Sequence, residues 1–297
     1  VLMHWLSKRR IMVLMILPTL ALYLLFIIIP VFVTIFYSFT KFSGIGSPEF
    51  LGFTNYTNLF QDKFFFIALK NSVIILLCTV VVLIPGSFGL ALLLEKPFRG
   101  NNLIKAMDFS PNVIAPILVG LMWVFILDPH MGLVNAFLQQ IGLESWQQEW
   151  IGGQTLTPYC VALVYIWQVL GFYATIFLAG LKTISPDIYE ASQIDGANRR
   201  QQVLFISLPM LKETITIICV LVITGGFKIF ETVQQLTNGG PNHFSEVLVT
   251  YMYYTTFTSN RYGYGMSIAT VTFLFSMICS VVYLRNTSTK IKRKGSN

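Results

Sequence analysis

Charged side chains are scarce in this sequence. Asp, Glu, Lys and Arg make up 11% of its 297 residues, whereas hydrophobic residues make up 55%. An average soluble domain contains about a quarter charged residues, and a water-soluble chain of this length could not bury so much apolar side chain in one core. A bilayer solvates such surface, so the composition indicates an integral membrane protein with little chain left for a second, soluble domain.

Motifs for enzymatic chemistry are absent as well. The sequence contains no G-x-x-x-x-G-K-[ST] phosphate-binding loop, so we expect no ATP hydrolysis by that route. Neither H-E-x-x-H nor G-x-S-x-G occurs. These absences favour a conduit over an enzyme, with energy supplied by a partner or by an ion gradient.

Cysteine and histidine are few and scattered. The four cysteines lie inside or at the edge of apolar runs without a neighbour at metal-ligand spacing, so we interpret them as small buried hydrophobic residues. The three histidines are far apart in the sequence, which favours loop histidines over a metal site.

Uncharged runs of about 20 residues, the length that crosses a bilayer as a helix, recur along the chain. The first is longer than the core of a signal peptide, so we interpret it as a retained helix. The fifth is short, and extending it to about residue 235 takes in Lys228 and Glu231. The sequence predicts an all-α membrane protein with six transmembrane helices, at residues 11–39, 71–94, 109–127, 157–181, 214–235 and 262–284.

Basic residues are distributed unevenly between the two sides of this arrangement. With six spans both termini share one side, and most of the 20 Lys and Arg residues fall on it. Positive loops stay cytoplasmic, so both termini are predicted to be inside. Topology therefore accounts for the net charge of +7, and no nucleic-acid partner is needed to explain it.

Proline and glycine interrupt several of the predicted spans. In lipid such residues persist only where neighbouring helices or water satisfy the freed backbone groups. Any one of them is explained by helix curvature, but together they suggest bent helices around an internal path. They are Pro18, Pro30, Pro85, Gly86, Pro111, Pro116, Gly225 and Gly226.

The loop between the fourth and fifth spans has the signals of a short helix. Ser185 is an N-cap candidate, Pro186 suits the first helical position, and Glu190 lies near the positive end of the helix dipole. Gly196 can adopt the left-handed conformation that ends a helix. We expect a second short helix that stops before Pro209, with Pro209 opening the fifth span.

The same loop resembles the EAA signature of importer-type ABC permeases. That signature runs Glu-Ala-Ala, three residues, Gly, nine residues, Ile-x-Leu-Pro, and residues 190–209 match every anchor except that Ser192 replaces the second Ala. Ser is small and should pack similarly. The alternative interpretation is a solvated loop with an interfacial helix.

Three further segments resemble maltose-type sugar permeases, which are MetI-like inner-membrane components. Residues 55–60 resemble their Asn-Tyr-x-x-Leu-Phe segment, 129–135 their Pro-x-x-Gly-x-x-Asn turn, and 237–241 their Thr-x-Gly-Gly-Pro element. The last is typical of the first-subunit branch. Together with the loop, these segments extend the resemblance over most of the chain.

The resemblance implies a type I ABC importer permease fold with coupling through the 185–209 loop. Its coupling residues would be Glu190, Ala191, Ser192, Asp195, Gly196, Ile206, Leu208 and Pro209. The implied organisation is a cytoplasmic N-terminus at 1–10, a first helix at 11–39, an extracellular loop at 40–66, a transmembrane domain at 67–284 with the coupling loop at 182–212, and a basic cytoplasmic tail at 285–297.

The resemblance also implies the partners. They would be a second permease subunit in a heterodimer, two ATP-binding subunits, an extracellular solute-binding protein, and a sugar or oligosaccharide, in a bacterial inner membrane. The chain itself would hold no cofactor, because ATP and Mg would bind the ATPase subunits.

The position of the sugar path follows from aligning the fourth and fifth spans with the maltose permease. Two glycines there would widen the path and Phe172 could stack on a sugar ring, but ordinary helix packing is an equal alternative. The aligned positions are Gln168, Val169, Phe172, Val222, Gly225, Gly226 and Ile229.

Two other functions remain open at this point. An ion-coupled secondary carrier would need intramembrane carboxylates or an internal repeat, and only Glu231 qualifies. An ABC permease for another solute, such as glycerol phosphate or a polyamine, is the other alternative. Lys228 and Glu231, one helical turn apart, could form a mutual pair, reach the membrane surface or gate the path.

Overall fold

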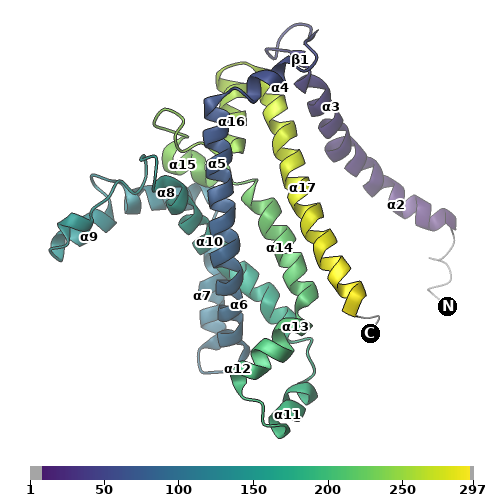
Figure 1. Ribbon diagram of the computed structural model, residues 1–297, viewed down its shortest axis with the longest axis vertical. Helices are drawn as coiled ribbons and strands as arrows, with labels where there is room; N and C mark the ends of the chain where they lie inside the picture. Colours follow the sequence, from purple (N-terminus) through teal and green to yellow (C-terminus); the bar gives the residue numbers. More distant parts are fainter. Residues whose placement is uncertain (1–8, 295–297) are drawn as a thin grey trace. The chain divides into compact units, whose positions relative to one another are not determined.

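The computed structural model describes residues 9–294, which are mostly helical (Figure 1). The chain divides into two compact units. One comprises Val1–Asp62 with Met252–Val271, and the other comprises Lys63–Tyr251 with Thr272–Asn297. Parts of the predicted cytoplasmic N-terminus and basic tail, at 1–8 and 295–297, lie outside the described residues.

The first unit contains the first predicted span and the hairpin that follows it. Its elements are α2 (Arg9–Tyr23), a π-helical turn η1 (Leu24–Ile28), α3 (Ile29–Ser38), strands β1 (Thr40–Lys41) and β2 (Glu49–Phe50), α4 (Thr54–Leu59), the π-helical turn η5 (Tyr254–Thr258) and the first residues of α17 (Tyr262–Lys294).

Asn55 organises the end of this first span. Its side-chain amide donates hydrogen bonds to the carbonyl oxygens of Ser38 at 2.8 Å and Thr40 at 2.9 Å, and the residue is buried. A buried amide satisfied in this way fixes the chain where it leaves the helix and enters the hairpin. The Asn-Tyr segment singled out in the sequence therefore has a local structural role.

The second unit contains most of the remaining helices. They are α5 (Lys63–Cys78), η2 (Thr79–Leu83), α6 (Ile84–Glu95), α7 (Asn101–Val113), α8 (Pro116–Leu127), α9 (Leu133–Gln140), η3 (Glu144–Trp146), α10 (Thr157–Leu181), α11 (Pro186–Ile194), α12 (Arg199–Gln202), η4 (Val203–Ser207), α13 (Leu208–Met210), α14 (Lys212–Gly226), α15 (Glu231–Thr237) and α16 (Leu248–Tyr253), which ends in the first unit.

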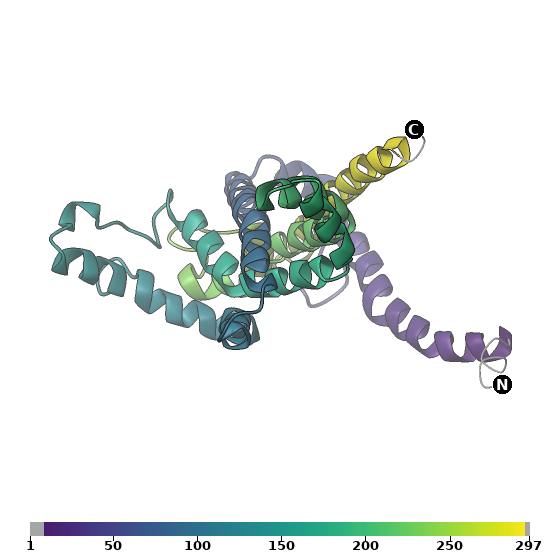
Figure 2. The same ribbon diagram turned by 90° about the horizontal axis from the view of Figure 1, so that it is seen from below.

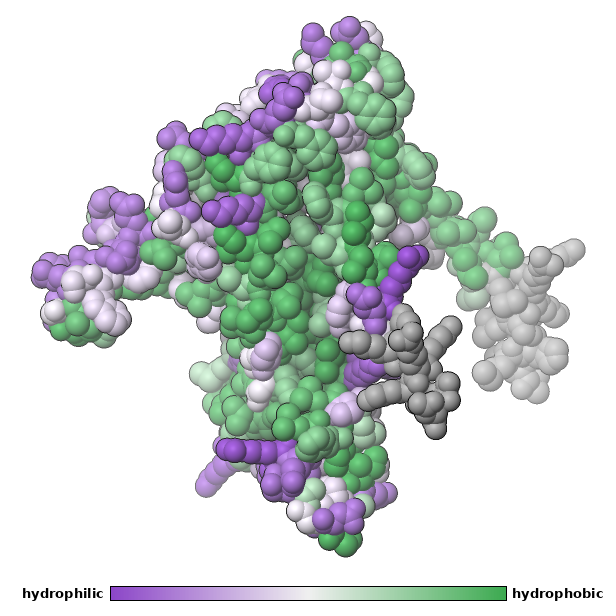
Figure 3. Space-filling model, viewed as in Figure 1, coloured by the Kyte–Doolittle hydropathy of each residue, from purple (hydrophilic) through white to green (hydrophobic). Residues whose placement is uncertain are grey.

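Helix α10 is the centre of this unit. It packs against α5, α6, α7 and α14, and Phe177 and Val164 on it are completely buried. Apolar side chains on the outer helices, such as Val81 and Leu93, are exposed instead, and green apolar surface covers much of the face drawn in Figure 3. This distribution suits a bundle surrounded by lipid.

The number of membrane-crossing helices depends on two bent pairs. Four helices are long and apolar enough to cross a membrane, at Val13–Ser38, Lys63–Glu95, Thr157–Leu181 and Tyr262–Thr287. The pairs Asn101–Val113 with Pro116–Leu127 and Arg199–Met210 with Lys212–Gly226 bend by 97° and 70°, and they raise the number to six if each pair is one span. In Figure 2, α7 is seen nearly along its axis while α8 lies across the view.

Three of the prolines are accommodated without breaking their helices. Pro30, Pro85 and Pro209 each lie two residues after a π-helical turn, namely η1, η2 and η4. A proline lacks the N–H that an α-helix needs and its ring crowds the carbonyl four residues earlier. The wider turn moves that carbonyl away, so the helix continues through the proline.

This accommodation corrects one prediction. The second short helix does not stop before Pro209, because η4 carries it on through Pro209 to Met210. The bend comes at Leu211, whose ψ of 9° is not helical, and α14 then starts at Lys212.

The fifth span also ends earlier than predicted. Helix α14 stops at Gly226, and α15 is a separate helix that begins at Glu231 after a break at Phe227–Phe230. Two consecutive glycines, both weak helix formers, precede this break. Lys228 and Glu231 therefore do not share a helix, and within residues 9–294 the two side chains form no ion pair.

Candidate functional site

The loop predicted to couple to an ATPase begins as a short helix with a hydrogen-bonded C-terminal cap. Helix α11 is Pro186–Ile194, with Ser185 at the N-cap but without a side-chain capping bond. At its other end, the N–H of Ala197 donates to the carbonyl of Ser192 at 2.8 Å and the N–H of Gly196 donates to that of Gln193 at 3.0 Å. This is the Schellman arrangement, and Gly196 has the positive φ of 82° that it requires. The predicted cap is confirmed.

A capping box that the sequence analysis missed starts the next helix. The N–H of Gln201 donates to Oδ1 of Asn198 at 3.0 Å, and the N–H of Asn198 donates to Oε1 of Gln201 at 2.8 Å. The spacing Asn-x-x-Gln is the sequence signal for such a box. Gly196 and Asn198 together fix the turn between α11 and α12.

Gln202, also missed from the sequence, joins the two helices. It is buried, and its Nε2 donates to Oγ of Ser192 at 2.9 Å and to the carbonyl of Tyr189 at 3.3 Å. The hydroxyls of Tyr189 and Ser207 make a second link at 3.0 Å. These contacts hold α11 against α12 and η4, so the loop is a packed pair of helices.

The outer surface of this pair is open. Glu190, Ala191 and Asp195 are exposed, and so are the apolar side chains of Ile194 and Phe205, at 87% and 74%. A cavity of about 250 Å³ is lined by Asp195, Gly196, Ala197, Gln201, Phe205 and Ile206. The structure thus brings the predicted residues Asp195, Gly196 and Ile206 together, while Glu190 and Ala191 lie outside the lining of this cavity.

One ion pair ties the loop to the second span. Nη2 of Arg199, the first residue of α12, lies 2.5 Å from Oε2 of Glu95, the last residue of α6. The pair is partly exposed, and pairs of this kind contribute only about 0–1 kcal/mol. The pair matters for position more than for stability, because it holds α12 next to the end of α6, 104 residues away in the sequence.

The residues predicted for the path lie on α10 and α14, except Ile229, which lies in the break after α14. Gln168 is buried, with its Nε2 donating to the carbonyl of Ile114 at 3.3 Å, while Val169 and Phe172 are half-buried. Val222 and Ile229 are buried within two hydrophobic clusters.

Gly225 and Gly226 face different neighbours. A Cβ on Gly225 would lie 2.7 Å from the hydroxyl oxygen of Tyr165 on α10, whereas one on Gly226 would lie 2.8 Å from Cδ1 of Leu76 on α5. Gly226 is buried and Gly225 is half-buried. Both glycines therefore permit close helix packing, and Gly225, which is the less buried of the two, is the better candidate for a position on a path.

The Gly-Gly-Pro loop after α15 encloses a buried carboxylate, that of Glu246. Glu246 is 2% exposed, its Oε1 lies 3.2 Å from Nδ1 of His243, and a Cβ on Gly239 would collide with it. Burial raises the pKa of Glu246. Gly239, with φ of 74°, is thus required twice, by its backbone conformation and by its contact with this carboxylate.

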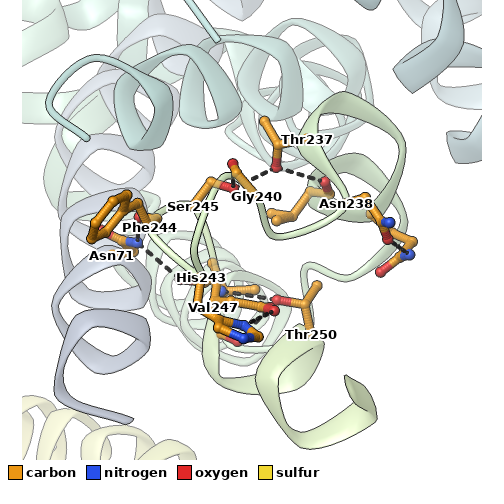
Figure 4. A network of polar contacts seen from close by, with 12 residues as sticks. Asn71, Thr237, Asn238, Gly240, His243, Phe244, Ser245, Val247 and Thr250 are labelled. Carbon is orange, nitrogen blue, oxygen red and sulfur yellow. Dashed lines mark hydrogen bonds and ion pairs between the residues drawn. The ribbon is translucent and has the colours of Figure 1, made fainter. Parts of the chain in front are cut away.

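Asn71 on α5 attaches this loop to the second span. Its side-chain amide donates to the carbonyl oxygens of Phe244 at 2.8 Å and Glu246 at 2.9 Å. Ser245 adds bonds of 2.7 Å to the hydroxyl of Thr237 and to the carbonyl of Gly240 (Figure 4). Hydrogen bonds from the side chains of Asn71 and Ser245 therefore fix the conformation of this loop.

Asn135 organises the turn after α8. It donates to the carbonyls of Pro129 and Gln148 and accepts a 2.8 Å bond from the indole N–H of Trp150. Asp128, at the start of the turn, accepts 2.8 Å bonds from the backbone N–H groups of Met131 and His130, and these bonds lower its pKa. Within residues 9–294, no group of three or more His, Cys, Asp or Glu side chains could hold a metal ion.

A comparison with known families decides what kind of protein this is. The family described as "Binding-protein-dependent transport system inner membrane component" matches residues 104–293, more than half of the chain. The chain belongs to this family. It is an ABC transporter permease, as the resemblance of the 185–209 loop predicted, and it works with a solute-binding protein and an ATPase.

Individual relatives agree with this assignment. The chain is 34% identical over 267 residues to the probable ABC transporter permease protein YurN of Bacillus subtilis, covering 89% of this chain and 91% of that one. It is 30% identical over 280 residues to the diacetylchitobiose uptake system permease protein NgcF of Streptomyces coelicolor, covering 89% and 79%.

The fold of the permease is that of a solved importer. A crystal structure of a bacterial ABC transporter involved in the import of the acidic polysaccharide alginate contains a chain that matches with a TM-score of 0.82 and 23% identity, covering 97% of this permease and 98% of that chain. The predicted all-α permease fold is confirmed.

Proposed function

We propose that this permease serves an ATP-driven importer of carbohydrates in a bacterial inner membrane, with both termini in the cytoplasm. The observation that supports coupling best is the helix pair α11–α12. It is fixed internally by Gln202 and capped at Gly196, yet Ile194 at the end of α11 and Phe205 on the adjoining η4 are exposed. A rigid pair with an apolar tip suits insertion into a groove on a partner protein.

The proposed cargo is a sugar or oligosaccharide. Several relatives at about 30% identity have names that refer to sugars: NgcF to diacetylchitobiose, AraP of Bacillus subtilis to arabinooligosaccharides and MsmF of Streptococcus mutans to multiple sugars. We extend this class of cargo to the present chain, without choosing a member.

Force would pass from the ATPase through the loop into the spans. Closure of the ATPase subunits would push on α11, and the Ser192–Gln202 bond would pass the displacement to α12. From there it would reach the second span through the Arg199–Glu95 pair and the fifth through the bend at Leu211. Glu190 is exposed and could pair with a basic residue of the ATPase.

The assembly proposed for this permease contains a second permease subunit, two ATP-binding subunits and an extracellular binding protein. ATP and Mg would bind only the ATP-binding subunits. The path would run beside α10 and α14, where Gly225 and Phe172 are both half-buried. The exposed faces of these helices would meet the second permease.

Reconstitution of the assembly tests this function. The permease alone should hydrolyse no ATP, whereas the complex should show ATPase activity that rises when a sugar-loaded binding protein is added. Uptake driven by a proton or sodium gradient without ATP would contradict the proposal.

Labelling tests the topology separately. In a chain whose four cysteines are replaced by Ser, Glu190→Cys should react with an impermeant maleimide only in opened cells, and Asn58→Cys should react in intact cells. Reaction of residue 190 from outside would reverse the proposed orientation and remove the coupling argument.

A further inference from the structure

A cavity of about 360 Å³ lies at the end of the second unit that also contains the coupling loop. It is formed where α6 ends, α7 begins and α10 ends. Its volume falls in the range of about 300–1,000 Å³ that is usual for small-molecule sites. Among its lining residues are Glu95, Phe98, Asn101, Lys105 and Lys182.

The cavity has a positive balance of charge. Glu95 is its acidic residue, and Arg199 already neutralises that carboxylate at 2.5 Å. Within the described part of the chain, neither Lys105 nor Lys182 lies within ion-pair distance of an acid. Two lysines therefore face a space whose carboxylate is already paired, which favours an anionic ligand.

The first turn of α7 adds a hydrogen-bond donor end and a hydrogen-bond acceptor. Gly100 is the N-cap of this 13-residue helix and has no side chain to cap it, so the positive end of the helix dipole carries no side-chain cap. Asn101 is 6% exposed and its amide donates to the carbonyls of Leu94 and Lys96, but its Oδ1 has no hydrogen-bond partner. Asn101 lines the same cavity as the two lysines, and an unpaired acceptor together with two cations suits a ligand with both a hydroxyl and a phosphate group.

Apolar side chains around the cavity place it at the membrane surface. Leu103 and Phe98 line the cavity and are 64% and 45% exposed. Leu93, two residues before Glu95 near the end of α6, is 72% exposed. In Figure 3, purple hydrophilic surface gathers at the lower end, over the α6–α7 connection, below the green apolar region. A ligand here would meet lysines and lipid-facing leucines at once.

We propose that this cavity binds the headgroup of an anionic phospholipid with a hydroxylated headgroup, represented by phosphatidylglycerol. The phosphate would lie between Lys105 and Lys182 at the start of α7, a headgroup hydroxyl would donate to Oδ1 of Asn101, and the acyl chains would cover Leu93 and Leu103. Basic pockets between helices on the cytoplasmic side are suited to such headgroups. The choice of side rests on the proposed function.

Such a lipid would act on the coupling loop directly. Lys182 is the first residue after α10 and begins the predicted 182–212 loop, while Glu95 is bound to Arg199 on α12. Lys182 therefore lines the cavity at the start of the loop, and Arg199, in the middle of the loop, is bound to a residue that lines it. A bound headgroup would brace the loop against the membrane.

Lysine labelling in vesicles tests the site with the unaltered chain. The purified complex is placed in phosphatidylcholine vesicles, with or without an equal amount of phosphatidylglycerol, and exposed amines are acylated and counted by mass spectrometry. Phosphatidylglycerol should protect Lys105 and Lys182, and should leave Lys63 and Lys70 on α5 unchanged. Equal protection by inorganic phosphate in phosphatidylcholine vesicles would show a free-anion site and overturn the lipid proposal.

Lipid retention supplies the second measurement. Lys105→Gln with Lys182→Gln should lower the phosphatidylglycerol retained in native mass spectra roughly 30-fold, from about fivefold per lysine near an anionic surface. Lys63→Gln with Lys70→Gln is the matched control and should retain it. Equal retention by both double variants would refute the site. Neither measurement requires transport, so a negative result for the lipid site can be distinguished from a failure of the proposed transport function.

Discussion

Gln202 donates a hydrogen bond to the hydroxyl of Ser192 across the two helices of the coupling loop, at 2.9 Å. Ser192 stands where the EAA signature usually has a second Ala, and Gln202 is buried. The departure from the signature thus coincides with a contact that only a hydroxyl can make.

Removing this contact should weaken coupling. Ser192→Ala leaves Nε2 of Gln202 with the longer bond to Tyr189 alone, a loss of about 0.5–1.5 kcal/mol. Gln202→Ala should cost more, because it also empties a buried site. ATPase stimulation by loaded binding protein should fall in both variants while the complex still assembles. A double variant no worse than Gln202→Ala would show that the residues act through one contact, and full additivity would show that they do not.

Gly196 should be needed for its backbone conformation alone. No atom lies within 4 Å of the position that a Cβ would occupy there, so its φ of 82° is the only obstacle to substitution. Gly196→Val should cost roughly 1–2 kcal/mol locally, leaving the protein inserted but uncoupled. Gly196→Asn, a residue that tolerates this conformation, is the control and should restore most sugar uptake. Full uptake by Gly196→Val would remove the loop from the coupling mechanism.

The two glycines of α14 should respond differently to added bulk. Gly226→Leu would press on Leu76 of α5 and should lower the yield of assembled complex, since overpacking costs about 1–3 kcal/mol. Gly225→Leu would meet the hydroxyl ends of Tyr165 and Tyr173 on α10, and should leave assembly and basal ATPase intact while blocking uptake. The measurements are gel-filtration yield and sugar uptake. Loss of assembly in both variants would favour helix packing over a path at residue 225.

Glu246 should make the loop after α15 sensitive to pH. Burial raises its pKa above the ordinary value, so its contribution to stability is complete below that ordinary value and is lost as the pH rises through the folded-state pKa. The titratable group that faces it is His243, whose Nδ1 lies 3.2 Å from its Oε1. Limited proteolysis of the loop should therefore speed up as the pH rises in the wild type, and Glu246→Gln should flatten the profile. An identical profile in both proteins would contradict this assignment.

The sequence predicted membrane-spanning helices best where the absence of charge alone defines them. The run at 157–181 is uncharged and is followed by Lys182, and it forms α10 with the bounds Thr157–Leu181. Gly196 was predictable because its conformation is local. Gln202 was not, because nothing in its neighbourhood in the sequence shows that Ser192 lies against it. The break after Gly226 was missed because hydropathy does not report helix ends.

The π-helical turn before Pro85 has a consequence for the angular phase of the second span. A regular α-helix advances by 100° per residue, so buried positions spaced by four drift around its axis by about 40° at each step. A turn with more residues reverses part of that drift. In the second span, buried residues recur at every fourth position before, within and after the π-helical turn η2. Without that turn, the row of buried side chains would rotate around the helix toward the lipid. The proline ring thus sets the rotation of α6 about its axis relative to the neighbouring helices. The buried row consists of Ile75, Thr79, Leu83, Ser87 and Ala91.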